Sequence, residues 1–179
     1  MNCRLALTIL AIGAAAVVAD AAEKVDIAKL ERKSLPADVY TNLKQGKRAS
    51  LLWRDTRFVV AAPYAVEKVE WLADDRNGSL MEYVTKQMQT LGQKDGAKYT
   101  VQVRVTGYED GAVKALKNKP SRLIVEAVVL DTSGAIVAAM VTSEKAGYYG
   151  HPARGGGFNE EGMADKVVSA LDSELMKGR

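Results

Sequence analysis

Cysteine and histidine are almost absent from this chain. Its 179 residues include one cysteine, Cys3, and one histidine, His151. One cysteine cannot form an intramolecular disulfide, and one histidine with scattered carboxylates supplies too few ligands for a typical zinc site. The chain also lacks the Gly-x-Ser-x-Gly and His-Glu-x-x-His motifs of common hydrolases. We therefore expect no metal and no cofactor, and an enzyme is the less favoured interpretation.

Long apolar runs are confined to the N-terminus. Arg4 precedes an apolar run at residues 5–18, which is shorter than the roughly 18 to 20 residues that span a bilayer. Small residues then fill the positions of a signal-peptidase site that ends at Ala21. We predict a signal peptide at 1–21 and no membrane span after it, the alternative being a buried helix or an uncleaved anchor. Cys3 precedes the apolar run, whereas a lipid-attachment cysteine would follow it.

Neither sign of charge is in large excess. The formal net charge is +3, with both signs interspersed, and 6% of the residues are aromatic. No stripe of basic and aromatic side chains indicates a nucleic-acid binder. The densest positive cluster, formed by Lys44, Lys47 and Arg48, is interpreted as a solvated turn. Nucleic acid is therefore not among the expected partners.

The first half of the chain indicates a buried strand and an amphipathic helix. The β-rich apolar run 58–62 predicts a strand buried on both faces and ended by a proline. The apolar residues of 64–72 fit either an extended segment or a helical turn, and we favour the extended one. Ser79 and Glu82 have the spacing of a capping box, and apolar residues at helical spacing then predict a helix that ends at Gly92.

The second half indicates three strands and a closing helix. Residues 99–106 alternate between apolar and polar side chains, as in a strand with one solvated face. The β-rich runs 123–130 and 135–141 flank an Asp-Thr-Ser-Gly turn, which predicts a hairpin. Asn159 is a good N-cap for the last helix. We predict an α+β fold in which two helices cover one face of a mostly antiparallel sheet of about four strands.

Three parts are expected along the chain. The signal peptide at 1–21 precedes a polar lead-in at 22–50 and a single α+β domain at 51–179. The lead-in is polar and poorly periodic, so we expect it to be loosely packed, with one helical turn after Pro36. The remainder is long enough to bury its own core.

The segment 147–162 gathers the most unusual residues of the chain. It contains the histidine, two adjacent tyrosines, an arginine and three consecutive glycines. Tyrosine combines apolar area with a polar tip, which suits contact with a partner. The equal alternative is that one ring covers the open end of the sheet. The candidate residues for contact with a ligand or partner are Tyr148, Tyr149, His151, Arg154 and Phe158.

Three interpretations of this segment remain open. A small hydrolase would use His151 with Arg154 and an acid such as Glu160. An anion-binding module would use the amides of 155–157 before the last helix, although Glu160 and Glu161 place negative charge there. A mobile connection is the favoured interpretation, because glycines impose no single conformation.

Two stretches carry a resemblance to a known group of proteins. The run Phe-Val-Val-Ala-Ala-Pro fills 58–63. Residues 123–139 contain, in this order, an acidic residue, a strand, Asp-x-x-Gly, a second strand and Ala-Ala. This pattern resembles bacterial envelope proteins of unknown function of the DUF3313 and DUF4410 type. The resemblance implies an envelope or periplasmic setting and a mixed α/β fold, and it supplies no catalytic residues. Members are often lipid-anchored, and this sequence departs from them because it lacks a lipobox cysteine.

Together these patterns predict an exported protein of the bacterial periplasm or envelope, soluble after cleavage near Ala21. We expect a non-catalytic module that binds or scaffolds an unknown envelope protein or a small ligand. The alternative is a small hydrolase or an anion-binding module that uses the segment 147–162.

Overall fold

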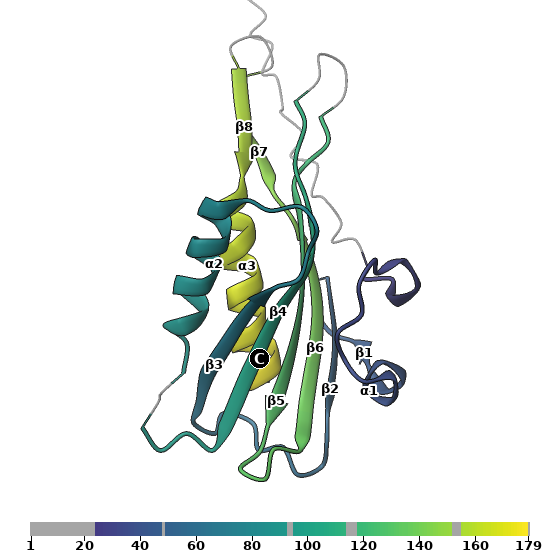
Figure 1. The fold of residues 1–179 in the computed structure, drawn as a ribbon, viewed down its shortest axis with the longest axis vertical. Helices are drawn as coiled ribbons and strands as arrows, with labels where there is room; N and C mark the ends of the chain where they lie inside the picture. The colour runs from purple at the N-terminus through teal and green to yellow at the C-terminus, as the bar shows by residue number, and fades with distance from the viewer. Residues whose placement is uncertain (1–23, 48, 93–94, 114–117, 152–154, 179) are drawn as a thin grey trace, which may run out of the picture.

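The computed structural model describes residues 24–47, 49–92, 95–113, 118–151 and 155–178. They form a six-stranded sheet with a two-stranded sheet at one end (Figure 1). The strands of the large sheet are β1 (Lys44–Gln45), β2 (Ser50–Arg54), β3 (Tyr64–Trp71), β4 (Tyr99–Glu109), β5 (Arg122–Leu130) and β6 (Ile136–Lys145). The helices are α1 (Ala37–Asn42), α2 (Gly78–Gln89) and α3 (Glu160–Ala170), with a 3-10 turn at Ile27–Lys29 and a π-helical turn at Leu171–Met176.

The large sheet is mixed and has the order β1-β2-β6-β5-β4-β3. β3 and β4 run parallel and are joined through α2, whereas the other neighbouring strands are antiparallel. The α+β class is confirmed, but the expected sheet of about four mostly antiparallel strands is wrong. The residues of an extended segment such as 64–71 do not show which strand it pairs with, or whether the pair is parallel. The connection through α2 decides that β3 and β4 are parallel, because a parallel pair needs a long connection between its strands.

The predicted strand at 58–62 is also wrong, because this run forms a loop between β2 and β3. Its two valines are 48% and 45% exposed, and Ala61 has a φ of 61°, in the left-handed region that interrupts a strand. Of the five residues only Phe58 is buried, with its ring stacked on Tyr99 at a centroid distance of 5.1 Å. The apolar run therefore anchors a loop and adds no strand.

Helices α2 and α3 cover one face of the large sheet, as predicted (Figure 1). The N-cap of α2 is Asn77, whose Oδ1 accepts a hydrogen bond from Leu80 N at 3.0 Å, so the predicted cap at Ser79 is wrong. The predicted N-cap of α3 is confirmed, because Asn159 Oδ1 accepts from Gly162 N at 2.8 Å. The core on this face includes Val84, Met88, Val101, Val103, Val125, Met140, Met163 and Val167.

The opposite face is covered by residues 24–43, which we call the strap. Figure 1 shows α1, within this segment, on the other side of the sheet from α2 and α3. The sequence predicts loose packing here, but the strap contributes to a second core. This core includes Val25, Leu30, Leu35 and Val39 from the strap and Leu51, Ile124, Val128, Ala139 and Val141 from the sheet. β5 and β6 are apolar on both faces, so their second face needs a cover.

Glu126 on β5 fixes the strap to the sheet. Its side chain is 0% exposed, and its carboxylate accepts hydrogen bonds from Ser34 N (2.8 Å), Ser34 Oγ and Tyr40 OH (2.6 Å). Arg104, its neighbour in register on β4, donates to Ser34 O at 2.9 Å. Burial and the hydrogen bond to Glu126 raise the pKa of Tyr40, so its hydroxyl stays protonated. The strap thus supplies the donors that a buried carboxylate needs.

Candidate functional site

The predicted contact residues other than Arg154 lie on a hairpin at one end of the molecule. β7 (Gly147–His151) pairs antiparallel with β8 (Gly155–Asn159), which leads directly into α3. Figure 1 shows this hairpin extending past the N-terminal ends of α2 and α3. Arg154 and the side chain of His151 lie outside the described residues.

The three aromatic candidates divide between the two faces of the hairpin. Tyr148 and Phe158 are paired in register and meet edge to face, with ring centroids 5.7 Å apart, and both are half-buried. Tyr149 points to the other face, because side chains alternate along a strand, and it is 61% exposed. One aromatic pair therefore packs within the hairpin, and one ring is exposed for contact.

The glycines of β8 make room for the tyrosines of β7. A Cβ on Gly156 would lie 2.2 Å from Tyr149 O and 2.5 Å from Tyr148 OH, and a Cβ on Gly157 would lie 2.9 Å from Tyr149 OH. Neither glycine has a positive φ. The favoured interpretation of a mobile connection is therefore wrong for residues 155–159, which are paired and closely packed.

Glu160 anchors the base of the hairpin. Its Oε1 accepts hydrogen bonds from Tyr108 OH (2.8 Å) and Ser121 Oγ (2.7 Å), and its Oε2 accepts one from Asn77 Nδ2 (2.8 Å). These donors come from β4, from the residue before β5 and from the N-cap of α2. Burial is the main cause that raises the pKa of Tyr108, so the phenol remains a donor. The acid of the hydrolase interpretation is thus held in a structural network.

A polar cavity of about 440 Å³ opens beside this network. Its lining residues are Asp75, Arg76, Asn77, Tyr108 and Asp110. The two acids follow different strands, β3 and β4, and the parallel pairing of those strands brings their ends together. The sequence carries no signal for this grouping, because neither acid is near the other along the chain. The cavity could accept a polar ligand that carries both donor and acceptor groups.

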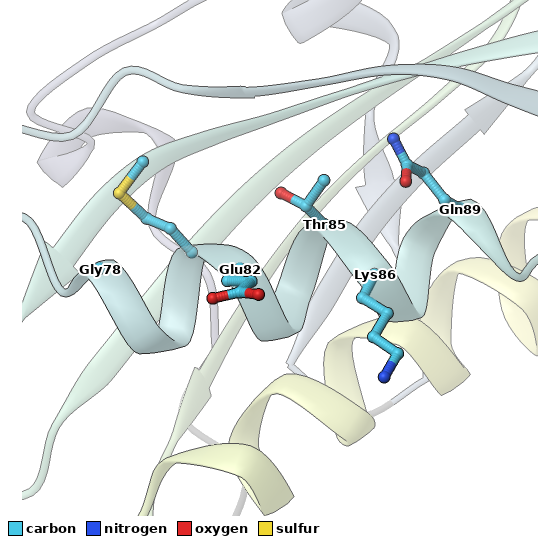
Figure 2. A pocket seen from close by; sticks show the side chains of 6 residues that line it. Gly78, Glu82, Thr85, Lys86 and Gln89 are labelled. Atoms are coloured by element: carbon cyan, nitrogen blue, oxygen red, sulfur yellow. The ribbon is translucent and has the colours of Figure 1, made fainter.

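A larger depression of about 540 Å³ follows the outward side of α2 (Figure 2). Its lining side chains include Met81, Thr85 and Gln89, which recur at helical spacing on one face. Figure 2 shows the labelled side chains on a single helix. Because no second element contributes, these side chains do not converge as in a typical ligand site.

Among the described residues, no group of three or more His, Cys, Asp or Glu side chains could hold a metal ion. No helix in the same ranges combines the length and apolar character needed to cross a bilayer. The candidate site comprises the exposed Tyr149 on the hairpin and the polar cavity beside the Glu160 network.

Comparisons with known proteins do not place the chain in a family. No family model matches it, and no curated protein matches it. Among solved structures, the PelC dodecamer from Paraburkholderia phytofirmans is similar, with 12% sequence identity and a TM-score of 0.45. The matched region covers 71% of this chain and 98% of the PelC chain.

Two further solved structures are lipoproteins by name. A candidate lipoprotein from Caulobacter crescentus is 20% identical, with a TM-score of 0.37, covering 59% of this chain and 86% of its own. Lipoprotein GNA1162 from Neisseria meningitidis is 13% identical, with a TM-score of 0.33. The matched region covers 63% of this chain and 96% of the GNA1162 chain. Likeness at these scores carries no argument for this chain. The resemblance to the DUF3313 and DUF4410 type stays a prediction.

Proposed function

We propose that this chain is an exported protein of the bacterial envelope that binds another envelope protein through the β7–β8 hairpin and catalyses no reaction. The observation that carries this proposal is Tyr149, which is 61% exposed on a hairpin whose other face is packed. Tyrosine is enriched among the residues that dominate binding energy at protein interfaces. Export is supported by the charged, apolar and small residues that follow one another within 1–21.

The hairpin is suited to pairing with a partner strand. Within the described residues, β7 and β8 pair only with each other, so each strand has an outer edge. An extended peptide can add to such an edge through main-chain hydrogen bonds. We therefore expect the partner to contribute an extended segment whose apolar side chains cover Tyr149.

The base of the hairpin is closely packed and hydrogen-bonded, which favours binding. The ring of Phe158 lies so close to Gly111 that a Cβ there would be 2.4 Å from it. Ser121 Oγ accepts a hydrogen bond from Gly111 N at 3.0 Å and donates to Glu160. A ring presented from an ordered base loses less conformational entropy on binding than one on a mobile loop.

Replacement of Tyr149 tests the proposal. Tyr149→Ala should weaken recovery of the partner after crosslinking in cells, by roughly 2 kcal/mol or about 30-fold in affinity. The matched control is Val60→Ala, because Val60 is 45% exposed in the loop after β2, near the opposite end of β6 from the hairpin. Both variants should unfold within about 0.5 kcal/mol of the parent, as usual for surface changes. Identical partner recovery by the two variants would refute a hairpin interface.

A further inference from the structure

A second cavity, of about 300 Å³, lies where β1 and β2 meet the C-terminal end of α3. It shares no lining residue with the hairpin or with the polar cavity beside it. Lys47, Arg54 and Glu174 bring charged side chains to it. Gly46 allows the close approach, because a Cβ there would lie 2.5 Å from Ser50 Oγ.

The π-helical turn after α3 places Glu174 in the wall of this cavity. Lys177 N donates to Asp172 O at 3.0 Å, which is the spacing of a π-helix, and such turns often occur at functional sites. Glu174 is 4% exposed, and its Oε2 accepts hydrogen bonds from Lys47 N (3.0 Å) and Ser50 Oγ (2.7 Å). The turn between β1 and β2 therefore holds a carboxylate that comes from the far end of the chain.

The Ser50 hydroxyl has one proton for two acceptors. Its Oγ lies 2.7 Å from Glu174 Oε2 and 2.6 Å from Lys47 O. A hydroxyl donates a single hydrogen bond, so it serves one of these two acceptors at a time. Glu126 differs, because each of its three contacts has its own donor. When Ser50 donates to the Lys47 carbonyl, Glu174 keeps one donor among the described residues, Lys47 N, and its carboxylate can accept another hydrogen bond from outside the chain.

Arg54 and Lys47 bring positive charge to the same cavity. Arg54 donates from Nε to Leu175 O at 3.1 Å and from Nη2 to Glu174 O, which fixes its guanidinium at the end of the helix. Burial lowers the pKa of Arg54, so this partly desolvated cation gains from an anion nearby. Lys47 is exposed. Part of the basic cluster seen in the sequence therefore lies at a cavity.

We propose that this cavity binds a small zwitterion that carries an ammonium group and a phosphate or carboxylate group. The ammonium donates to the carboxylate of Glu174 and to the Lys47 carbonyl, because both residues line the cavity and an –NH₃⁺ group has three donors. The anion lies against Arg54 and Lys47, which form charge-assisted hydrogen bonds. A cavity of about 300 Å³ is at the small end of ligand sites. Ethanolamine phosphate, soluble or as a lipid headgroup, has this chemistry.

The test titrates O-phosphoethanolamine into the isotope-labelled chain and follows the amide signals of Lys47 and Ser50 by NMR. Saturable shifts are expected. Phosphocholine is the matched probe, because it has the same charges but no N–H donor, and it should bind about tenfold more weakly. Methyl phosphate, which has no cation, should also bind about tenfold more weakly at equal ionic strength.

Variants assign the binding to this cavity. Glu174→Gln should weaken the binding of O-phosphoethanolamine about tenfold, because the amide lacks the charge and one acceptor, whereas Glu161→Gln on the exposed first turn of α3 should not. Lys47→Gln, at an exposed position, should also weaken the binding of O-phosphoethanolamine and should leave the fold intact.

Vesicle flotation distinguishes the two sources of the ligand. If the protein floats with vesicles of phosphatidylethanolamine and not with vesicles of phosphatidylcholine, the ligand is a lipid headgroup. If the protein binds the soluble probe alone, the ligand is a soluble zwitterion. The proposal is overturned if the shifts do not saturate, if phosphocholine binds equally, or if Lys47→Gln binds like the parent.

Discussion

Three glutamates illustrate how residue identity alone leaves a role undecided. Glu126, Glu160 and Glu174 each accept hydrogen bonds from segments distant in the sequence. Glu126 secures the strap, Glu160 secures the base of the hairpin, and Glu174 lines a cavity. Their roles differ because the donors around each carboxylate come from different segments, which the fold brings together.

At the residue scale, we predict that Glu126→Ala is strongly destabilising. The change leaves the partly buried Tyr40 OH and Ser34 N without their acceptor, which should cost about 3 kcal/mol in the free energy of unfolding. Glu109→Gln is the matched control, because Glu109 forms partly exposed ion pairs with Lys119 and Arg122, and it should cost less than about 1 kcal/mol.

Urea unfolding measures both variants, and hydrogen exchange of the Ser34 amide reports on the strap directly. Exchange at Ser34 should accelerate in Glu126→Ala. Unchanged exchange at this amide would show that the carboxylate does not hold the strap.

At the element scale, the glycine-rich segment shows why composition predicts conformation poorly. Consecutive glycines favour a mobile connection when they are considered alone. In β8 they instead accept the rings of Tyr148 and Tyr149, which lie across the strand. Packing of an aromatic ring over a cross-strand glycine pins the register of such a hairpin.

Two alanine substitutions in β8 compare an added Cβ that meets the main chain with one that meets only a side chain. Gly156→Ala should disrupt the hairpin, because its Cβ would meet the main-chain oxygen of Tyr149 at 2.2 Å. Gly157→Ala should be tolerated, because its Cβ would meet only the tip of the Tyr149 ring at 2.9 Å, and that exposed side chain can move. Amide exchange of β7 measures the difference, and equal protection in both variants would contradict it. Each variant should keep the stability of the large sheet, since the hairpin is a separate sheet.

At the scale of the whole molecule, the protein is a sheet with two unlike covers. The helices α2 and α3 form one cover, and the strap forms the other. The surface away from these cores carries ion pairs such as Arg57–Asp55 and Lys68–Glu70. Exposed pairs of this kind contribute little individually, but together they make stability depend on pH.

We predict that the protein loses stability in acid. Hydrogen bonds from Arg57 lower the pKa of Asp55 to about 2, from an ordinary value of 3.8, and neighbouring donors also lower the pKa values of Glu70 and Asp131. A folded pKa below the unfolded value means that the unfolded chain binds more protons, so this stability is complete above the unfolded pKa. It is lost as the pH falls through about 4 towards 2.

Urea midpoints measured at a series of pH values check this dependence. The midpoint should fall below about pH 4, and Asp55→Asn should make the curve shallower, because it removes one of the depressed carboxyl groups. A midpoint that stays constant across this range, or a variant whose curve matches the parent, would contradict the prediction.

The sequence by itself determined the features that depend on near neighbours. The helices of 78–89 and 160–170, the hairpin of 122–145 and the N-cap at Asn159 were predictable, because caps, turns and periodicity involve residues a few positions apart. Only the tertiary structure decided that β3 runs parallel to β4, that the strap covers the second face, and that Glu174 meets Ser50. These features join residues far apart along the chain, where local patterns carry no information about which segments meet.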